Sequence, residues 1–529
     1  MEREHSCDVL IAGGGIAALC AAWKAGEAGC SVTLIPAGGL FSGSSFYPGT
    51  WGLGLIGPED ASDRDDLVDA VCRVGCGMAS RAMAESFVSG ISPAIAELRG
   101  LGVKLRRARQ REQREFIPCF DHKTRDWNGI EFESVRQVLG KRLEELGVTV
   151  LDRGQVLRLV TEGGRVRGAA ALFRGRLRFL GCRAFVLATG GYGGIFQRRL
   201  CTGDVAGMGQ ALALEAGCSL IHMEFMQIMP GFLSPAAGTV FNEKAFRFSD
   251  LTLPDGAPLL PPGEESRRLL ELRSTHGPFT SRLESRAVDL ALAWAEEGAE
   301  VTYSPELREN PPEFVAAYFD WLAREKGLTA ADPVRIGLFA HAANGGVAIG
   351  PDASAGVPGL FACGEVTGGM HGADRIGGLS TANGLVFGGR VGQAAAAAAA
   401  GAPEPPGRCE FQSWSCPETG EMTRTLRQTM TRYAMVPREG AGLSRALETV
   451  EALDRRLRET RAPTAAAEEA ARTRRLECRL VTARCVLQAT SLRRESRGSH
   501  FRADFPRQDP ALARPILVDR GGAAFLERI

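Results

Sequence analysis

The chain is 529 residues long, and its 63 basic and 62 acidic side chains leave a formal net charge of +1. This length exceeds what one ordinary hydrophobic core serves and predicts two or three packed units. The near-zero charge excludes the electrostatic signature of nucleic-acid binding or of attachment to an acidic membrane surface, so small molecules are the expected partners.

The segment before the first predicted strand is short and polar. Residues 1–7 leave no space for the apolar region of a secretory signal, and no uninterrupted apolar stretch reaches membrane-spanning length. A cytoplasmic location is the default expectation. The 14 cysteines contain no CxxC pair, so we expect reduced core thiols and no metal site or attached c-type haem.

Residues 7–37 predict a β-strand, a glycine turn, a helix and a second strand. The turn has the pattern Gly13-x-Gly15-x-x-Ala18. Gly13 suits a tight turn, and Gly15 lets the backbone approach a pyrophosphate at the N-terminus of the helix. A turn made only for packing is the alternative, but the position between two strands favours a dinucleotide. The acid that would hold a ribose about twenty residues later is replaced by residues 35–37, IPA, which argues against NAD in particular.

The next segments predict helices around a Rossmann-type sheet and then an insertion. Helical periodicity covers residues 62–102 and 136–147. Two β-rich runs then end at residues 189–191, TGG, where a buried strand would bring its carboxyl end to a ligand. Taken by themselves, these small residues are better explained by a plain tight turn. Between 232 and 330 the composition becomes irregular, with a Pro/Gly-rich loop and two helical stretches, which indicates an inserted domain.

The last third of the chain returns to a strand, a turn and a long helix before a helical region. A helix is expected from near Ser380 through the alanine tract that ends at residue 400. Residues 402–407, APEPPG, form a linker, and residues 408–500 contain two or three helical stretches. The C-terminal unit is therefore predicted to be a helical bundle.

Several motifs follow one another along the chain: GGGIAAL, GSSFYPG, VLATGGYGGIF with TGDVAGMGQALALEAG, HAANGGVAIG, GLFACGEVTGGMHGADR and RRESRGSHFRADFP. Together they resemble the flavoprotein family of succinate dehydrogenase, fumarate reductase and L-aspartate oxidase, in the family's order and over nearly the whole chain. The last motif is similar to the L-aspartate oxidase and succinate dehydrogenase branches. It is unexpected in fumarate reductases that are fused to cytochromes.

The resemblance implies the fold class and the domains. The fold is expected to be α/β, with a Rossmann-like FAD-binding domain, an inserted α+β capping domain and a C-terminal helical domain. The expected ranges are 1–231 and 336–401 for the FAD-binding domain, 232–335 for the capping domain and 408–529 for the helical domain.

The same resemblance implies FAD as the cofactor. Membrane-bound succinate dehydrogenases attach FAD through a histidine at about the position of Ser44, so non-covalent binding is expected here. The glycine turn would hold the pyrophosphate, and two acids would bind near the ribose or ribityl hydroxyls. The expected cofactor contacts are Gly13, Gly15, Ala18, Ser44, Ser45, Gly190, Asp204, Glu365 and Ser380.

In the resembling family a dicarboxylate lies over the flavin, hydride passes between them, and an arginine moves the proton. His341 and Arg375 match two substrate-binding positions, and such groups suit carboxylates. The structural alternatives are a turn cap for His341 and a pair with Asp374 for Arg375. Arg282 matches the proton-transferring arginine only if one residue is deleted, and Ser281 takes that position without the gap.

Residues 224–231, EFMQIMPG, depart from the family sequence EFxQFHPT. Gln227 remains, but Met229 replaces the histidine and Gly231 the threonine. Glu243 matches the acid of a Thr-Glu pair, whereas the RGEG loop after it is absent. Because methionine donates no hydrogen bond to a carboxylate, a larger, more apolar or singly carboxylated substrate is expected in place of succinate, fumarate or aspartate.

The sequence therefore predicts an FAD-dependent oxidoreductase that transfers hydride at a C–C or C–N bond beside a carboxylate. A genuine L-aspartate oxidase or soluble fumarate reductase is one alternative. A flavin-binding electron-transfer subunit without substrate chemistry is another, and it has no reason to keep Arg375 and His341 facing the flavin. An oligomer or an electron-transfer partner is possible, and the electron acceptor is unknown. His122 and Trp127 either add new specificity or are ordinary exposed loop residues.

Overall fold

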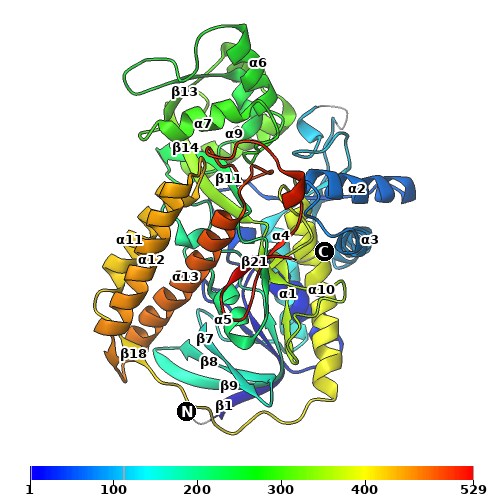
Figure 1. The fold of residues 1–529 in the computed structure, drawn as a ribbon. Coiled ribbons are helices and arrows are strands. Elements are labelled where there is room, and N and C mark those ends of the chain that lie inside the picture. Colours follow the sequence, from blue (N-terminus) through cyan, green and yellow to red (C-terminus); the bar gives the residue numbers. More distant parts are fainter. Residues whose placement is uncertain (2, 111–113, 528–529) are drawn as a thin grey trace.

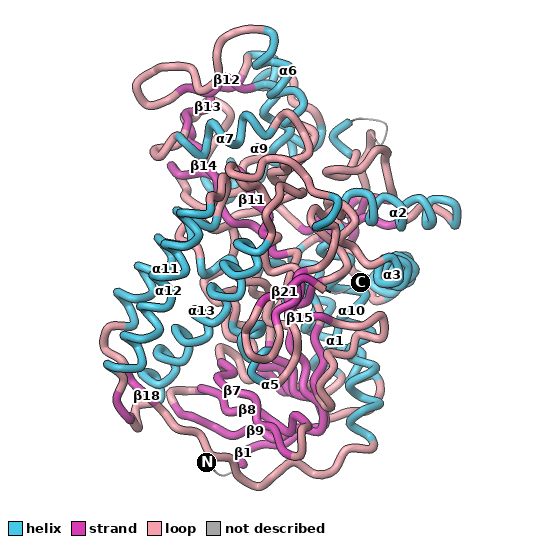
Figure 2. Tube along the Cα trace, in the orientation of Figure 1, coloured by secondary structure: helices cyan, strands magenta, loops and turns pink. Residues whose placement is uncertain are grey.

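The computed structural model describes residues 1, 3–110 and 114–527. Its largest sheet has the strand order β6-β2-β1-β9-β8-β7, with β16 also paired to β9 (Figures 1 and 2). The strands are β1 (Arg3–Ala12), β2 (Val32–Ile35), β6 (Thr149–Val150), β7 (Gln155–Glu162), β8 (Arg165–Phe173), β9 (Arg176–Leu187) and β16 (Leu360–Ala362). β1 pairs in parallel with β2 and β9, so the carboxyl ends of these strands meet at one edge.

Helices α1 (Ile16–Glu27) and α10 (Leu379–Ala400) pack closely against each other. Glycines of α10 allow this contact, because a Cβ on Gly388 would lie 2.7 Å from the Ala17 carbonyl oxygen. Three further helices pack outside this pair: α4 (Phe132–Glu145) against α1, α3 (Arg81–Gly100) against α10, and α2 (Ala61–Val74) against α3. The predicted βαβ unit is confirmed, and α10 fixes the direction in which the N-terminus of α1 points.

A second antiparallel sheet, β11-β14-β13-β12, connects this unit to the inserted segment at the top of Figure 1. Its strands are β11 (Met226–Ser234), β12 (Ser249–Thr252), β13 (Ala299–Tyr303) and β14 (Val334–Ala343). Four helices cover it: α6 (Glu264–Arg273), α7 (Arg286–Trp294), α8 (Pro305–Glu309) and α9 (Glu313–Lys326). The two helical stretches that the sequence predicted here correspond to α7 and α9, whereas α6 and α8 were not predicted. The short strands were not predicted either, because their partners lie far away along the chain.

Two smaller groups of elements complete the unit that is built on the largest sheet. β3 (Leu53–Gly57), β5 (Asp126–Ile130) and β4 (Leu105–Arg106) form a three-stranded antiparallel sheet. α5 (Met208–Ala216) leads into β10 (Leu220–Ile221), which pairs with β15 (Gly346–Ala348), itself paired with β17 (Thr367–Gly368).

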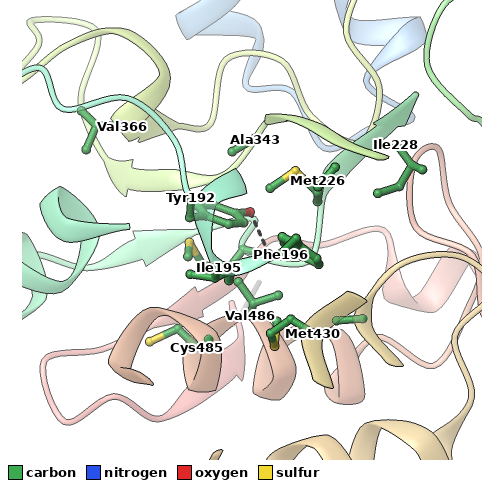
Figure 3. Close-up of a cluster of buried hydrophobic side chains, with 14 of the residues drawn as sticks. Tyr192, Ile195, Phe196, Met226, Ile228, Ala343, Val366, Met430, Cys485 and Val486 are labelled. Carbon is green, nitrogen blue, oxygen red and sulfur yellow. Dashed lines mark hydrogen bonds between the residues drawn. The ribbon is translucent and has the colours of Figure 1, made fainter. Parts of the chain in front are cut away.

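Helices α11 (Thr419–Ala434), α12 (Gly440–Thr460) and α13 (Ala467–Leu492) form the predicted helical bundle. Figure 3 shows Met430 of α11 and Cys485 of α13 next to Tyr192 and Phe196, which follow β9 of the largest sheet. The Tyr192 hydroxyl donates a hydrogen bond to the Met223 carbonyl at 2.9 Å. The bundle thus shares one hydrophobic core with the segment that leads into β11.

The chain after α13 leaves the bundle. β20 (Ile516–Val518) pairs with β10, and β21 (Ala524–Leu526) pairs with β20, so the tail extends the sheet formed by β17, β15 and β10. A purely helical description therefore fits α11 to α13 and not the last residues. The domain ranges given above remain a proposal.

The motif RRESRGSHFR contains a chain of buried ion pairs. Arg493 Nε lies 2.7 Å from Glu224 Oε1, and its Nη1 lies 2.8 Å from Glu495 Oε1. Arg497 Nε lies 2.7 Å from the same Glu495 oxygen. Because Glu224 immediately precedes the strand of the EFMQIMPG segment, this motif anchors β11 from the C-terminal side.

All fourteen cysteines are free thiols, as the sequence predicted. Among the described residues, no helix is long and apolar enough to cross a membrane. The same residues contain no group of three or more histidine, cysteine or acidic side chains placed to hold a metal ion.

The stability of the fold is expected to fall as the pH decreases from 7.5 to 5.5. Five histidines have lowered pKa values because burial disfavours the charged ring: His222, His276, His341, His371 and His500. For His222 the pKa is about 3. These rings stay neutral when folded but take up protons in the unfolded chain below pH about 6.5, so unfolding becomes easier as pH falls.

Denaturant titration at the two pH values measures this effect. Each histidine contributes on the order of 1 kcal/mol of lost stability at pH 5.5, so the free energy of unfolding should fall by several kcal/mol. Equal stability at both pH values would contradict the buried neutral state of these rings.

Candidate active site

A cavity of about 360 Å³ extends from the glycine turn after β1 to the base of the inserted unit. The ends of β1 and β9 line it, together with residues 42–54, part of β14 and the segment 363–384. Parallel strands place their carboxyl ends at one edge of a sheet, which is where α/β proteins bind ligands.

The glycine turn closes one end of the cavity with backbone alone. Gly13 has a φ of 141°, and a Cβ there would lie 2.2 Å from the Ala188 carbonyl oxygen. A Cβ on Gly14 would lie 2.4 Å from the Gly39 carbonyl oxygen. Helix α1 begins without a side-chain cap from Gly15, and the Ile16 N–H donates to Ser45 Oγ at 3.2 Å. An uncapped helix N-terminus at a cavity of bare backbone fits a phosphate group.

Glu365 lies in the middle of this cavity wall. Its Oε1 accepts a hydrogen bond from the Ala343 N–H at 2.9 Å, and its Oε2 accepts one from the Ser44 hydroxyl at 3.1 Å. Burial raises the pKa of this carboxyl above its usual range. A half-buried carboxylate held by two donors retains lone pairs for ligand hydroxyl groups, so Glu365 suits the role expected of it.

Most of the other expected cofactor contacts line the same cavity. They are Gly15, Ser44, Ser45, Gly190, Asp204 and Ser380. Ala18 is different, because it lies fully buried in the core one step further into α1 and does not line the cavity. Its small side chain serves helix packing, which the third position of such fingerprints also requires.

Arg375 and His341 lie at the other end of the cavity, and both line it. The Arg375 guanidinium donates to Gln227 Oε1 from Nε at 3.2 Å and from Nη2 at 2.8 Å. It also donates to the Ile376 carbonyl at 3.3 Å. Gln227 itself does not line the cavity, so it positions Arg375 from behind.

His341 is a neutral ring in this cavity. Burial first, and the charge of Arg375 second, lower the pKa of His341 to about 3. Its Nδ1 is buried and has no hydrogen-bond partner among the described residues. No hydrogen bond within the described residues engages Nε2 either, so the neutral imidazole can donate to a ligand or accept from it at Nε2, depending on the tautomer.

The Met229 side chain forms an apolar part of the wall. It packs in one cluster with Leu200, Val240 and Phe339. A Cβ on Gly277 would lie 3.2 Å from the Met229 terminal methyl carbon, so the methionine reaches the side of the cavity formed by residues 277 and 278. The segment EFMQIMPG is thus both a core strand and a cavity wall.

Arg282 does not line the cavity. Its Nε lies 2.9 Å from Asp374 Oδ2, and its guanidinium lies over the Phe120 ring at 5.3 Å. The Thr280 hydroxyl donates to the same Asp374 oxygen at 2.7 Å. The partner of Asp374 is therefore Arg282, and the suggested pair between Asp374 and Arg375 is wrong. Ser281, the other candidate for the proton-transferring position, does not line the cavity either.

Cys119 and Glu243 both line the cavity. The sequence indicated Glu243 as a candidate site residue but not Cys119. The Cys119 thiol donates to Glu243 Oε1 at 3.3 Å, and the Gly277 N–H donates to Cys119 Sγ at 3.2 Å. Burial, and then the charge of Glu243, raise the pKa of Cys119 to about 12. The thiol therefore keeps its proton at neutral pH. No motif surrounds Cys119, so the sequence carried no signal for it.

His122 lies at the surface, where its Nε2 is 3.2 Å from Asp66 Oδ1, and it does not line the cavity. The interpretation as an ordinary surface residue therefore fits His122. Trp127 lies on β5 and is half-buried.

Comparison with known proteins gives two family matches. The family described as "FAD binding domain" matches residues 8–248 and 292–381, and "Fumarate reductase flavoprotein C-term" matches residues 423–519. The L-aspartate oxidase of Mycobacterium leprae is 30% identical over 97% of this chain and 95% of its own length. A fumarate reductase (CoM/CoB) chain of Methanothermobacter marburgensis is 26% identical, covering 98% of this chain and 98% of its own length.

Solved structures show the same fold. The Mycobacterium smegmatis Sdh1 complex in the apo form superposes with a TM-score of 0.81 at 24% identity, covering 100% of this chain and 94% of that one. An E. coli quinol fumarate reductase FrdA superposes with a TM-score of 0.79 at 22% identity, covering 100% and 97%.

Proposed function

Because the chain belongs to the FAD-binding flavoprotein family of succinate dehydrogenase, fumarate reductase and L-aspartate oxidase, we propose that it oxidises or reduces a carboxylate-bearing substrate at a C–C or C–N bond beside the carboxylate. The family membership makes the protein an FAD-dependent oxidoreductase and confirms the predicted α/β fold class and the FAD cofactor. The substrate and the direction of the reaction belong to the proposal.

One observation carries the substrate class. Arg375 and His341 both face the cavity that begins at the glycine turn, and Gln227 orients the arginine. A buried guanidinium without a carboxylate partner among the described residues suits a carboxylate from a ligand. This arrangement argues against an electron-transfer subunit without substrate chemistry.

The residues present fit FAD. Gly13 to Gly15 and the N-terminus of α1 would hold the pyrophosphate, and Asp204 and Glu365 would accept hydrogen bonds from hydroxyl groups. Ser44 stands at about the position of the covalent histidine, which supports non-covalent binding. Bound FAD supplies a two-electron acceptor or donor for the substrate carbon.

The chain's own residues would bind the substrate and hold its proton. Arg375 and His341 bind the carboxylate and thereby fix the adjacent bond. Arg282 is paired with Asp374 outside the cavity. We therefore assign the transfer of the substrate's proton to Cys119 Sγ, which is hydrogen-bonded to Glu243 Oε1. A thiol held protonated in this way can donate its proton only to a strongly basic centre such as a substrate carbon that has taken up an electron pair, and the thiolate then regains a proton from water or by way of the Glu243 carboxyl.

Met229 supports a substrate other than the short dicarboxylates of the family. The wall that it forms with Leu200 and Val240 offers no hydrogen bond to a second carboxylate. A genuine L-aspartate oxidase or fumarate reductase is the second candidate function, because the chain retains Gln227, His341 and Arg375.

The test begins with the purified protein. Acid should release a yellow, non-covalent flavin, and anaerobic screening of carboxylic acids should find one that bleaches it. A folded preparation without flavin would end the proposal. Bleaching by aspartate or succinate at ordinary concentrations would favour the second candidate function.

Met229→His is expected to raise the affinity for succinate and aspartate about tenfold or more, since a hydrogen bond to a charged group contributes about 1.5–3 kcal/mol. The affinity is measured from the change in the flavin spectrum on titration. Met229→Leu is the matched control, because it keeps the apolar wall and should gain nothing. Unchanged affinity in a flavin-loaded Met229→His variant would show that this wall does not contact the substrate.

A further inference from the structure

A second chamber of about 850 Å³ adjoins the first cavity beneath the inserted unit. Trp51, Cys119, Glu243 and Gly377 line both spaces. The second chamber is far larger than a four-carbon acid requires. Because the second chamber adjoins the end of the first cavity where the substrate is proposed to bind, it can hold the rest of a longer substrate.

Aromatic side chains form much of its wall. The Trp51 ring lies 5.8 Å from Phe314 and 6.4 Å from Trp321, both on α9. Phe116 lies 6.0 Å from Trp127 and 6.2 Å from Phe314. These rings hold one another in edge-on and tilted contacts and leave apolar surface toward the chamber, which suits a ring or another apolar body.

Lys244 is the unusual residue of this chamber. It lines the chamber and is only 3% exposed. Among the described residues, its ammonium group has no carboxylate within 4.0 Å and no hydrogen-bond acceptor. The neighbouring buried cations are paired, since Arg247 Nη2 lies 2.9 Å from Glu115 Oε1 and Arg273 Nε lies 2.8 Å from Asp289 Oδ2.

An unpaired ammonium in such a place is costly, because burial removes its hydration without supplying a counter-charge. A ligand anion would supply both the charge and the hydrogen-bond acceptors. Two buried carboxylates also line the chamber, but each is engaged elsewhere: Glu115 Oε1 lies 2.9 Å from Arg247 Nη2, and Glu243 Oε1 accepts a hydrogen bond from the Cys119 thiol. Further charged side chains of the chamber, such as Arg324 and Glu325 on α9, are exposed.

We propose that the substrate carries two anionic groups joined by an apolar, ring-containing body. One carboxylate binds at Arg375 and His341, the body lies along the aromatic wall past Cys119, and the second anion pairs with Lys244. This inference rests on the proposed function of Arg375 and His341. It identifies a substrate class larger than the short dicarboxylates and explains an apolar wall at Met229 together with a buried cation further out.

The test compares matched acids with one and two carboxylates on the flavin-loaded enzyme. The probes are phenylacetate, 3-phenylpropionate, 1,4-phenylenediacetate and 1,4-phenylenedipropionate, titrated against the flavin spectrum and by calorimetry. At least one diacid is expected to bind tenfold or more tightly than its monoacid. Lys244→Met should remove this preference and leave monoacid binding unchanged, and Lys244→Arg should retain it.

Lys141→Met, an exposed substitution on α4, is the matched control and should preserve the preference. Flavin content and thermal melting verify that Lys244→Met is folded. Equal binding of monoacids and diacids by the unmodified enzyme, or a preference that survives Lys244→Met, overturns the second anion site alone. Failure of every acid to bind while flavin is present overturns the proposed function as well.

Discussion

Gly13→Ala is expected to yield protein that retains less than about a tenth of the normal flavin. A Cβ at this position would lie 2.2 Å from the Ala188 carbonyl oxygen and 2.8 Å from its carbonyl carbon, and the φ of 141° is strained for any L side chain. Both atoms are backbone at the end of β9, so no side chain can rotate away. Incompatible substitutions of this kind cost more than about 1 kcal/mol and disturb the backbone that faces the cavity.

The measurement is the ratio of flavin to protein absorbance after purification. Gly100→Ala is the matched control, because a Cβ there meets nothing within 4 Å at the end of α3. Gly15→Ala separates a folding defect from a binding defect. Its Cβ would only approach Ser45 Oγ at 3.2 Å, so this variant should fold normally and bind flavin more weakly. Normal flavin content in Gly13→Ala would show that the cofactor is held elsewhere.

The sequence predicted the parts of the fold that depend on local pattern. The glycine turn, helix α1 and strand β2 follow from residues within one short segment, and α10 follows from its alanine tract. The sheet of the inserted unit was not predicted, because β12 and β13 are short and their partners are distant in sequence. The tail strand β20 was missed for the same reason, since it pairs with β10.

In the candidate site, too, the sequence predicted the residues that lie in local motifs and missed those that only the fold brings together. The cofactor side was predictable, because its glycines and Glu365 lie in motifs. The residues expected to face the substrate were harder to predict, because Cys119 contacts Glu243, which lies 124 residues away in the sequence. Arg282 was assigned by its spacing before α7, whereas its contact with Asp374 depends on how residues 92 positions apart fold together. No sequence pattern indicates Lys244, because its lack of a charged or hydrogen-bonding partner is evident only from the residues that surround it in the structure.

One motif changed its meaning once the structure was known. RRESRGSHFR is part of the family resemblance, but Arg493, Glu495 and Arg497 pair with one another and with Glu224, and none of the three lines the cavity. The Ser499 N–H and hydroxyl donate to the Ala373 carbonyl at 3.1 and 2.9 Å. This motif therefore holds the segment that carries Arg375 and supports the site indirectly.

Arg375→Leu is expected to reduce carboxylate binding and turnover about a thousandfold while flavin content stays normal. Losing one partner of a buried, hydrogen-bonded charge pair costs about 2–5 kcal/mol, and about 4 kcal/mol corresponds to three orders of magnitude. The guanidinium contacts Gln227 and the Ile376 carbonyl, and not the glycine turn, so the cofactor seat should remain intact. Steady-state kinetics and spectral titration with the best acid found in the screen measure the loss.

The same substitution should make the ligand-free protein slightly more stable. Burial lowers the pKa of Arg375 and the charge of Glu365 offsets only part of this effect, since among the described residues no carboxylate lies within 4.0 Å of the guanidinium. Replacing such a cation by an apolar side chain removes a desolvation cost. Gln227→Leu is the control for position: it leaves the cation in place, should weaken acid binding only about tenfold, and should not raise the melting temperature. An Arg375→Leu variant that melts lower and still binds acids would mean that the arginine serves the fold and not the substrate.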